Sequence, residues 1–543
     1  MEESPTSTEA RPPEQITPVK ATSKVMPSLS GSEGAMLNNA PESDEASTQI
    51  DPAEFKNQAK WVSYTCGLGI GIVFSLWALP LTGAINTVMN GASNCVSTKS
   101  QNTYSLMFFI QAIAFILSSA FVGTLGDRWG RKVVLQYSTA GYLTTGFFYM
   151  LALETKTVPF FFIGAFTTGI TTPVLAHGFA YMSDLNVAIR RKGVPKSKAE
   201  ELSLFGTAQY GACIYGGLFA GCILTLVLVA IGGESLCFIV SVISAIICLV
   251  INHFKLLNLP DKKARLDKIK CKHVTPNFAK ICKPDNVARQ NGFVFGLNGC
   301  IILFYVTFYA YFAILPNYTR LRFFPGVSSG TACGSTGDDD DMTNKEKKEQ
   351  EAEQTEANLL TLLVILLFMI LPAFGLIGYK KLQEKAGGTQ PGFIVSACIV
   401  VIMPIICGIA ESYGVFLLGL IFWTASGPMN IYVSRMWYGQ AEESDAGQFA
   451  AILREDSGFG VLIGVLLFGG FFSAHLESGG MTGPMPGAPL LLGLIPLILA
   501  IIFSKYVFSK YGHHDKTKDA LVQGTGAAVP KQSSEVSSNS EEV

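Results

Sequence analysis

The chain has 543 residues, of which 49% are apolar and only 15% are charged, whereas a soluble protein of ordinary composition carries about 25% charged residues. The charges gather at the termini and in a few polar stretches, and the apolar residues form segments of about 20 residues or longer, the length that a helix needs to cross a bilayer. This distribution excludes a single soluble domain, a nucleic-acid-binding protein and a secreted disulfide-rich scaffold, and the net charge of −1 indicates no particular partner.

Twelve apolar segments follow one another along the chain, each long enough for a transmembrane helix. Glycine is frequent, with 54 residues, and small residues let helices approach one another closely in lipid. We therefore predict an all-α integral membrane protein with a packed bundle of twelve transmembrane helices. They are placed at residues 61–90, 103–126, 133–152, 158–183, 202–231, 235–256, 291–317, 358–379, 391–410, 413–436, 449–473 and 487–510.

The loops between these segments differ in basic residues, which are enriched on the cytoplasmic side of a membrane. The loops after the fourth, sixth and eighth segments carry Lys and Arg, whereas those after the fifth, ninth and eleventh carry none. Even-numbered loops and both termini are therefore predicted to be cytoplasmic. The expected organisation is two disordered tails, two six-helix halves and a cytoplasmic linker between the halves. In chain order these are residues 1–60, 61–256, 257–290, 291–510 and 511–543.

One predicted extracytoplasmic segment, residues 318–357, is long and acidic. Its composition favours a solvated, mostly disordered insert, and a vestibule that attracts cations is the alternative. Cys95 and Cys333 both lie on this side of the membrane and could form a disulfide. Asn317 begins a glycosylation sequon at the membrane edge. The other cysteines form no regular ligand set, so we expect neither a metal site nor a cofactor.

A polar motif, GTLGDRWGRK, lies between the second and third segments at residues 123–132. It resembles the signature loop of the major facilitator superfamily at every specified position, and the resemblance covers residues 61–510. The resemblance implies the major facilitator fold, with two six-helix repeats that transport by alternating access. Anchoring by positive charge alone would explain the basic residues, but not the glycine spacing or the aspartate. The motif residues proposed for the gate are Gly123, Gly126, Asp127, Arg128, Gly130 and Arg131.

The motif suggests how one end of the bundle closes. Gly123 and Gly126 are spaced to allow close helix approach, and a buried carboxylate at Asp127 needs partners. We predict that Asp127, Arg131 and Asp184 form one charge cluster beneath the first six-helix half. Asp127 would also face the start of the eleventh helix, because a helix N-terminus favours negative charge.

The second half repeats the spacing of the first. The two motif glycines recur 252 positions later as Gly375 and Gly378, and the tyrosine near the end of the fourth helix recurs 251 positions later as Tyr432. The second copy has Tyr379 in place of the motif aspartate and Arg435 in place of the acid that ends the fourth helix. Such a repeat is typical of transporters with parallel halves, and it predicts two gates that differ chemically.

By the resemblance, the first, fourth, seventh and tenth helices line a central path. They carry polar residues inside apolar stretches, and polar groups at membrane depth normally face a bundle interior or water. For each residue the alternative is an interhelical hydrogen bond without solute contact. The candidates for a solute cavity are Asn86, Thr171, His177, Asn298, Tyr305, Tyr309, Trp423 and Asn430.

Three ionisable residues are candidates for coupling transport to protons, namely His177, Glu455 and Asp456. A coupled carrier needs a group whose ionisation changes as the site reorients, and histidine titrates near neutral pH. The alternatives are a packing role for His177 and a gate salt bridge that joins Arg454 to the two acids. A facilitator without a coupling ion would use none of them.

The sequence thus predicts a secondary active or facilitative transporter of a small organic solute, and not an enzyme. A transporter-like receptor that binds a solute without translocating it is the alternative. The expected partners are the solute, the lipid bilayer and, for a coupled carrier, protons, but no nucleic acid, and we expect a monomer. The membrane is predicted to be the plasma membrane or an endomembrane, such as that of a vacuole or lysosome.

Overall fold

The computed structural model describes residues 50–93, 95–171, 174–259, 292–328, 344–438 and 446–512. These residues belong to one compact unit that extends from Ser47 to Val543. Within the described ranges all regular secondary structure is helical. Most of the two predicted tails and of the predicted linker lies outside these ranges.

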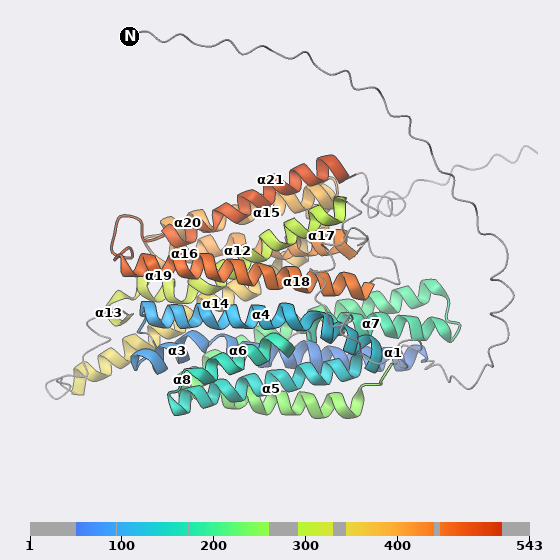
Figure 1. Cartoon of the computed structure of the whole chain (residues 1–543), viewed down its shortest axis with the longest axis horizontal. Helices are drawn as coiled ribbons and strands as arrows, with labels where there is room; N and C mark the ends of the chain where they lie inside the picture. Colours follow the sequence, from blue (N-terminus) through green and yellow to red (C-terminus); the bar gives the residue numbers. More distant parts are fainter. Residues whose placement is uncertain are drawn as a thin grey trace, which may run out of the picture. The chain divides into compact units, whose positions relative to one another are not determined.

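The first half begins with one long interrupted helix, in which the π-helical stretch η1 joins α1 to α2 and α3 continues the segment. Helix α4 starts with a capping box, in which Ser97 and Ser100 exchange hydrogen bonds between side chain and backbone. The elements, drawn from blue to green in Figure 1, are α1 Pro52–Val62, η1 Ser63–Gly69, α2 Ile70–Ala78, α3 Leu81–Asn90, α4 Thr98–Trp129, α5 Arg131–Thr155, α6 Pro159–Thr171, α7 Val174–Arg191 and α8 Lys196–Lys255.

The second half has a similar order of long helices, with a 3₁₀ stretch, η2, and a second π-helical stretch, η3. Its elements are α12 Gly292–Phe323, α13 Pro325–Ser328, α14 Asn344–Ala386, α15 Thr389–Ile409, α16 Tyr413–Leu420, η2 Ile421–Ala425, α17 Ser426–Tyr438, α18 Ala446–Gly464, η3 Val465–Gly469, α19 Gly470–Glu477, α20 Ala488–Leu492 and α21 Leu494–Tyr511.

Helix α8 bends at Gly232 and Gly233 and therefore contains two predicted transmembrane helices, the fifth and the sixth. Gly233 has a φ of +68°, which side chains other than glycine rarely adopt, and the bend lies in the predicted loop between the fifth and sixth helices. Nine described helical stretches are long and apolar enough to cross a membrane. One of these stretches, Phe205–Lys255, includes the bend and so counts once where two helices were predicted. The twelve predicted helices are therefore compatible with the structure. The all-α membrane fold is confirmed.

Several helices differ from their predicted bounds, and two of them extend into the predicted acidic segment. Helix α14 begins at Asn344, inside the segment expected to be mostly disordered, because Lys, Glu, Gln and Ala are strong helix formers. Helix α12 continues to Phe323, beyond the predicted end at residue 317. The fourth predicted helix consists of α6 and α7, and the sequence has Pro173, a helix breaker, between them.

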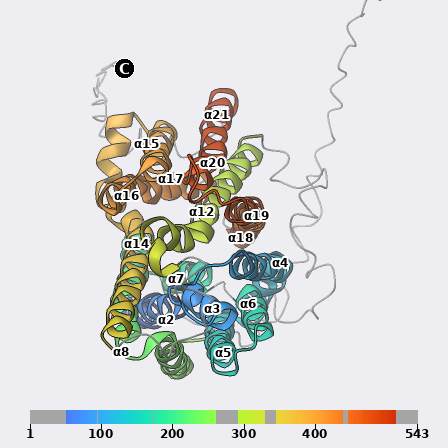
Figure 2. The same cartoon turned by 90° about the vertical axis from the view of Figure 1, so that its left-hand side faces the viewer.

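The helices of the two halves gather in separate groups, with α2 to α8 in the lower part of Figure 2 and α12 and α15 to α21 in the upper part. Helix α4 packs along α18, and α8 packs against α14, so these pairs connect the halves. Within the first half, glycines bring α8 close to η1 and α2. A Cβ at Gly221 would lie 2.7 Å from Ile72 Cα, and one at Gly217 would overlap the backbone of Leu68.

Candidate functional site

The signature loop joins α4 to α5 through a single residue, Gly130. Its φ is +91°, and a Cβ there would overlap the side chain of Asn258, so this position requires glycine. Arg131 begins α5, and its Nε lies 3.3 Å from Asp184 Oδ2 on α7. The structure therefore brings together two members of the predicted charge cluster. The side chains of Asp127 and Arg128 lie outside the described residues.

The close helix approach expected at the two motif glycines is not seen among the described atoms. A Cβ at Gly123 would meet no described atom within 4 Å. A Cβ at Gly126 would lie 2.6 Å from Arg131 Nη1 and 3.2 Å from His177 Cε1. Gly126 therefore makes room for two side chains rather than for a helix backbone.

At the corresponding end of the second half, the groups that accept hydrogen bonds are neutral. The Tyr432 hydroxyl donates to the Tyr379 carbonyl at 2.6 Å, and Arg435 Nη1 donates to Gln383 Oε1 at 3.4 Å. An amide oxygen thus accepts from Arg435, whereas the first half pairs a guanidinium with the Asp184 carboxylate. The two ends differ chemically in these contacts.

Buried charges also lie where α18 meets α4. Arg454 and Glu455 are only 7% and 1% exposed. Glu455 Oε1 accepts a hydrogen bond of 2.7 Å from Ser119. Arg454 Nη2 lies 3.4 Å from Ser118 Oγ, and its guanidinium carbon lies 4.2 Å from the centre of the Phe115 ring. Charged groups at membrane depth are costly, and they commonly mark functional sites.

Three further side chains join this region from other helices. His177 on α7 is 8% exposed and interacts electrostatically with Arg454. Tyr142 on α5 interacts electrostatically with both Arg454 and Tyr309 on α12. We call His177, Tyr142, Tyr309, Arg454 and Glu455 the central cluster. It draws on both halves, at the junction where a solute path is expected.

Several predicted cavity residues contact neighbours in their own half. Thr171 donates to the Thr167 carbonyl at 2.7 Å and packs against Gly141. Asn86 donates to the Ser93 carbonyl at 3.1 Å. Both hydrogen bonds are local, so neither is the interhelical hydrogen bond that was the alternative for each residue.

The other candidates lie on the second half. Tyr305 lies beside Tyr309, with 6.3 Å between ring centroids, and Trp423 stacks on Phe368 at 4.5 Å. Asn430 is half-buried on α17. Several predicted residues have a buried polar atom without a hydrogen-bonding partner among the described residues, and these atoms are Asn86 Oδ1, His177 Nδ1, Asn298 Oδ1, Trp423 Nε1 and Asp456 Oδ2.

At the end of the bundle opposite the signature loop, the halves meet through side-chain amides. Asn317 Nδ2 on α12 donates to Gln101 Oε1 in the first turn of α4 at 2.7 Å. Asn358 Nδ2 on α14 donates to Ser93 Oγ at 2.8 Å. Arg320, which is 2% exposed, donates to the oxygens of both amides at 3.5 and 3.4 Å. It thereby orients their NH₂ groups toward the first half, and we call these five residues the seal.

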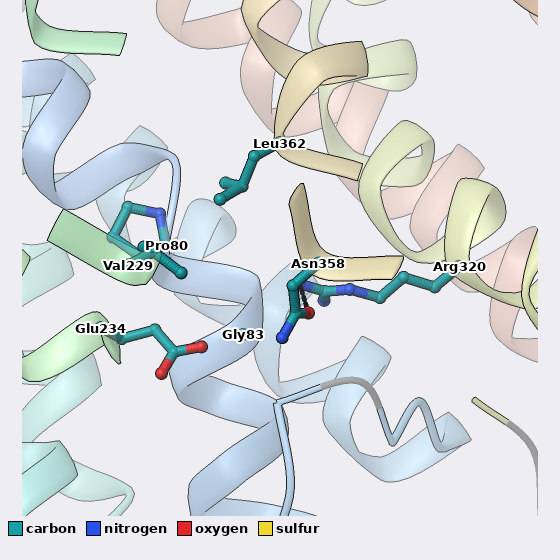
Figure 3. A pocket seen from close by; sticks show the side chains of 7 residues that line it. All are labelled: Pro80, Gly83, Val229, Glu234, Arg320, Asn358 and Leu362. Carbon is teal, nitrogen blue, oxygen red and sulfur yellow. Dashed lines mark hydrogen bonds between the residues drawn. The ribbon is translucent and has the colours of Figure 1, made fainter. Parts of the chain in front are cut away.

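A small cavity of about 10 Å³ lies beside the seal, with room for about one water molecule. Figure 3 shows Arg320 reaching Asn358 on one side of this cavity and Glu234 pointing toward it from the other. Glu234 lies close to Gly83, where a Cβ would be 2.6 Å from its Oε1. The cavity therefore has a cation and an anion on its walls, contributed by different halves.

The same end contains two residues singled out in the sequence. Asn317 is 1% exposed, and its amide is engaged with Gln101, which leaves no room for a glycan in this conformation. Cys95 is disulfide-bonded, and Cys333, its predicted partner, lies outside the described residues.

The cavity candidates came from the first, fourth, seventh and tenth predicted helices, so they did not include Tyr142, Ser118 and Ser119. Gln101 and Arg320 were not predicted from the sequence either. A polar residue within a transmembrane helix was the available signal for the first three. The partner of each could be found only from the packing of the helices.

A family model described as Major Facilitator Superfamily matches residues 66–444. The search of curated proteins found no match. Similar solved structures include the nucleoside transporter NupG, at 13% identity and a TM-score of 0.54, covering 84% of this chain and 98% of that one.

The human organic anion transporter MFSD10 (TETRAN) is 14% identical with a TM-score of 0.54, covering 83% of this chain and 99% of its own. A D-xylose–proton symporter is 13% identical with a TM-score of 0.52, and the match covers 84% of this chain and 98% of the symporter. At these identities the similarity shows the fold alone.

Proposed function

This chain belongs to the major facilitator superfamily and is a multi-pass membrane protein of solute transport, and we propose that it moves a small organic solute by alternating access. The observation that carries the proposal is the central cluster, because its charged, imidazole and hydroxyl groups come from both halves. A site shared by two repeats changes its access when one repeat rocks against the other.

We assign the signature loop to the cytoplasmic side, because the basic loops lie with it. The seal then closes the extracytoplasmic side, and the ion pair of Arg131 with Asp184 lies at the cytoplasmic side of the same conformation. We propose that the two ends open in turn, the seal for exchange with the extracytoplasmic side and the signature loop for exchange with the cytoplasm.

Protons are the coupling ion that we propose, with His177 and Glu455 as the groups that exchange them. Both lie in the central cluster, where a change of access changes their solvation. Facilitated diffusion is the alternative, and in that case both residues serve structure alone.

Uptake into proteoliposomes tests the proposal. The purified full-length protein is assayed with neutral, zwitterionic and anionic organic solutes, with and without a pH gradient. Empty liposomes provide one baseline. The other is a protein whose seal is held closed by a disulfide between cysteines introduced at Gln101 and Asn317. Solute flux above both baselines supports transport, whereas saturable binding without flux would favour the receptor alternative.

A further inference from the structure

Arg454 is a buried cation that forms no ion pair within the described part of the chain. Its contacts are a neutral hydroxyl, Ser118 Oγ at 3.4 Å, and the face of the Phe115 ring at 4.2 Å. Its Nε has no hydrogen-bonding partner among the side chains and backbone that the structure describes, although the side chain is only 7% exposed. A guanidinium at membrane depth normally pairs with an anion or with carbonyl groups.

The acids that follow Arg454 in the sequence form no ion pair with it. The charge of Glu455 acts on Arg454, but Glu455 is the next residue on the helix, so its side chain leaves α18 about 100° away, and its carboxylate accepts the hydrogen bond from Ser119. Asp456 is buried as well, and its Oδ2 has no hydrogen-bonding partner among the described residues. The ion pairs within the described ranges join Arg131 to Asp184 and Lys192 to Asp51, so the described carboxylates do not occupy the N–H donors of Arg454.

The surroundings of Arg454 suit an organic anion. Tyr142 and Tyr137 lie within electrostatic range of its guanidinium, and Tyr309 lies within electrostatic range of Tyr142. Aromatic faces favour an apolar body, and the planar fork of a guanidinium matches a carboxylate in geometry.

We propose that Arg454 binds the carboxylate of the transported solute, so that the solutes of this protein are organic carboxylates. This inference rests on the proposed transport function and names its substrate class. The carboxylate completes the charge pairing of Arg454 while the solute is bound between the halves.

Matched ligand pairs test this inference by binding. Benzoate and nicotinate are compared with benzamide and nicotinamide, which keep the ring and lose the charge, and chloride and sulfate serve as inorganic probes. We expect the carboxylates to bind the full-length protein and raise its melting temperature, and the amides to bind at least about tenfold more weakly. Arg454→Gln should remove this preference, and Arg454→Lys should retain part of it.

Arg322→Gln is the control, because Arg322 donates to a backbone carbonyl, that of Ala410, and should keep the preference for carboxylates. If Arg454→Gln fails to fold, the inference is still tested by the preference for carboxylates over amides in the wild type and in Arg454→Lys. No carboxylate binding to the wild type, equal binding of acids and amides, or binding of inorganic anions alone would overturn the inference. Flux of neutral solutes alone would also overturn the carboxylate inference, but it would leave the proposed transport function intact. Carboxylate binding without flux would overturn the transport function and leave the carboxylate site at Arg454 intact.

Discussion

Arg131 and Asp184 tie the start of α5 to α7 at 3.3 Å, and Asp127 lies four residues before this arginine in the sequence. Asp127→Asn removes a charge while nearly keeping the size of the side chain. The closed signature end should lose stabilisation, and a loss of 1–2 kcal/mol changes a population by a factor of roughly 5–30. We therefore expect a folded protein whose initial uptake rate falls by about that factor, measured at matched protein amounts.

Asp51→Asn is the matched control for this prediction. Asp51 caps α1 through Glu54 N–H and forms an exposed ion pair of 3.8 Å with Lys192, a kind of contact that contributes little. Its uptake rate should stay near that of the wild type. Wild-type turnover in Asp127→Asn would count against the proposed gate.

His177 and Glu455 make a second prediction at the scale of single residues. The charged groups that act on His177 are Arg131 and Arg454, and Glu455 is held by Ser119. If a pH gradient drives wild-type uptake, His177→Gln and Glu455→Gln should each flatten the dependence of uptake on pH. His253→Gln, at an exposed position near the end of α8, should leave that dependence unchanged. Wild-type pH profiles in both variants would exclude the two residues as coupling groups.

At the scale of elements, the seal determines how α12 and α14 meet the first half. Gln101→Cys combined with Asn317→Cys replaces the 2.7 Å hydrogen bond between these side chains. Mild oxidation should cross-link the pair and stop uptake, and a reductant should restore it, because α4 and α12 must separate during each cycle. The cross-link is detected as two fragments that stay joined after proteolysis in the predicted linker.

Arg320 gives this experiment its internal check. In the double-cysteine protein Arg320 still donates to the Asn358 amide, which joins α14 to the first half. Arg320→Gln removes this donor, so the yield of the cross-link should fall in that background. Each single cysteine variant should keep uptake under the same oxidation. Undiminished uptake in the cross-linked protein would contradict the role of the seal.

The contact between α8 and the first transmembrane segment makes another prediction at this scale. Gly217→Ala places a methyl group against the backbone of Leu68, and overpacking of this kind costs about 1–3 kcal/mol. The melting temperature of the purified protein should fall. Gly211→Ala lies on the same helix with no described atom within 4 Å of its Cβ, and it should be neutral or slightly stabilising. Equal effects of the two changes would mean that packing at Gly217 does not limit stability.

At the scale of the whole molecule, the sequence predicted the helices better than their contacts. Long apolar runs and the repeat from Gly123 to Gly375 are local signals, so the order of the helices followed from them. The side on which a polar residue leaves its helix is set by packing, and for this reason Thr171 was expected in the path although it packs against Gly141. The seal escaped prediction because Gln101 and Asn317 are 216 positions apart.

The orientation of the protein in the membrane is the last prediction, and it rests on the asymmetry of Lys and Arg between the loops. Ten basic residues lie between Lys255 and Arg289, whereas the loop after the eleventh predicted helix has none. Protease sites inserted after Ser335 and after Thr275 should therefore be cut from opposite sides of sealed vesicles, the second from the cytoplasmic side. Cleavage after Ser335 from the cytoplasmic side would invert the assignment of the seal and of the signature loop. The central cluster would keep its place between the halves, because its contacts do not depend on which end faces the cytoplasm.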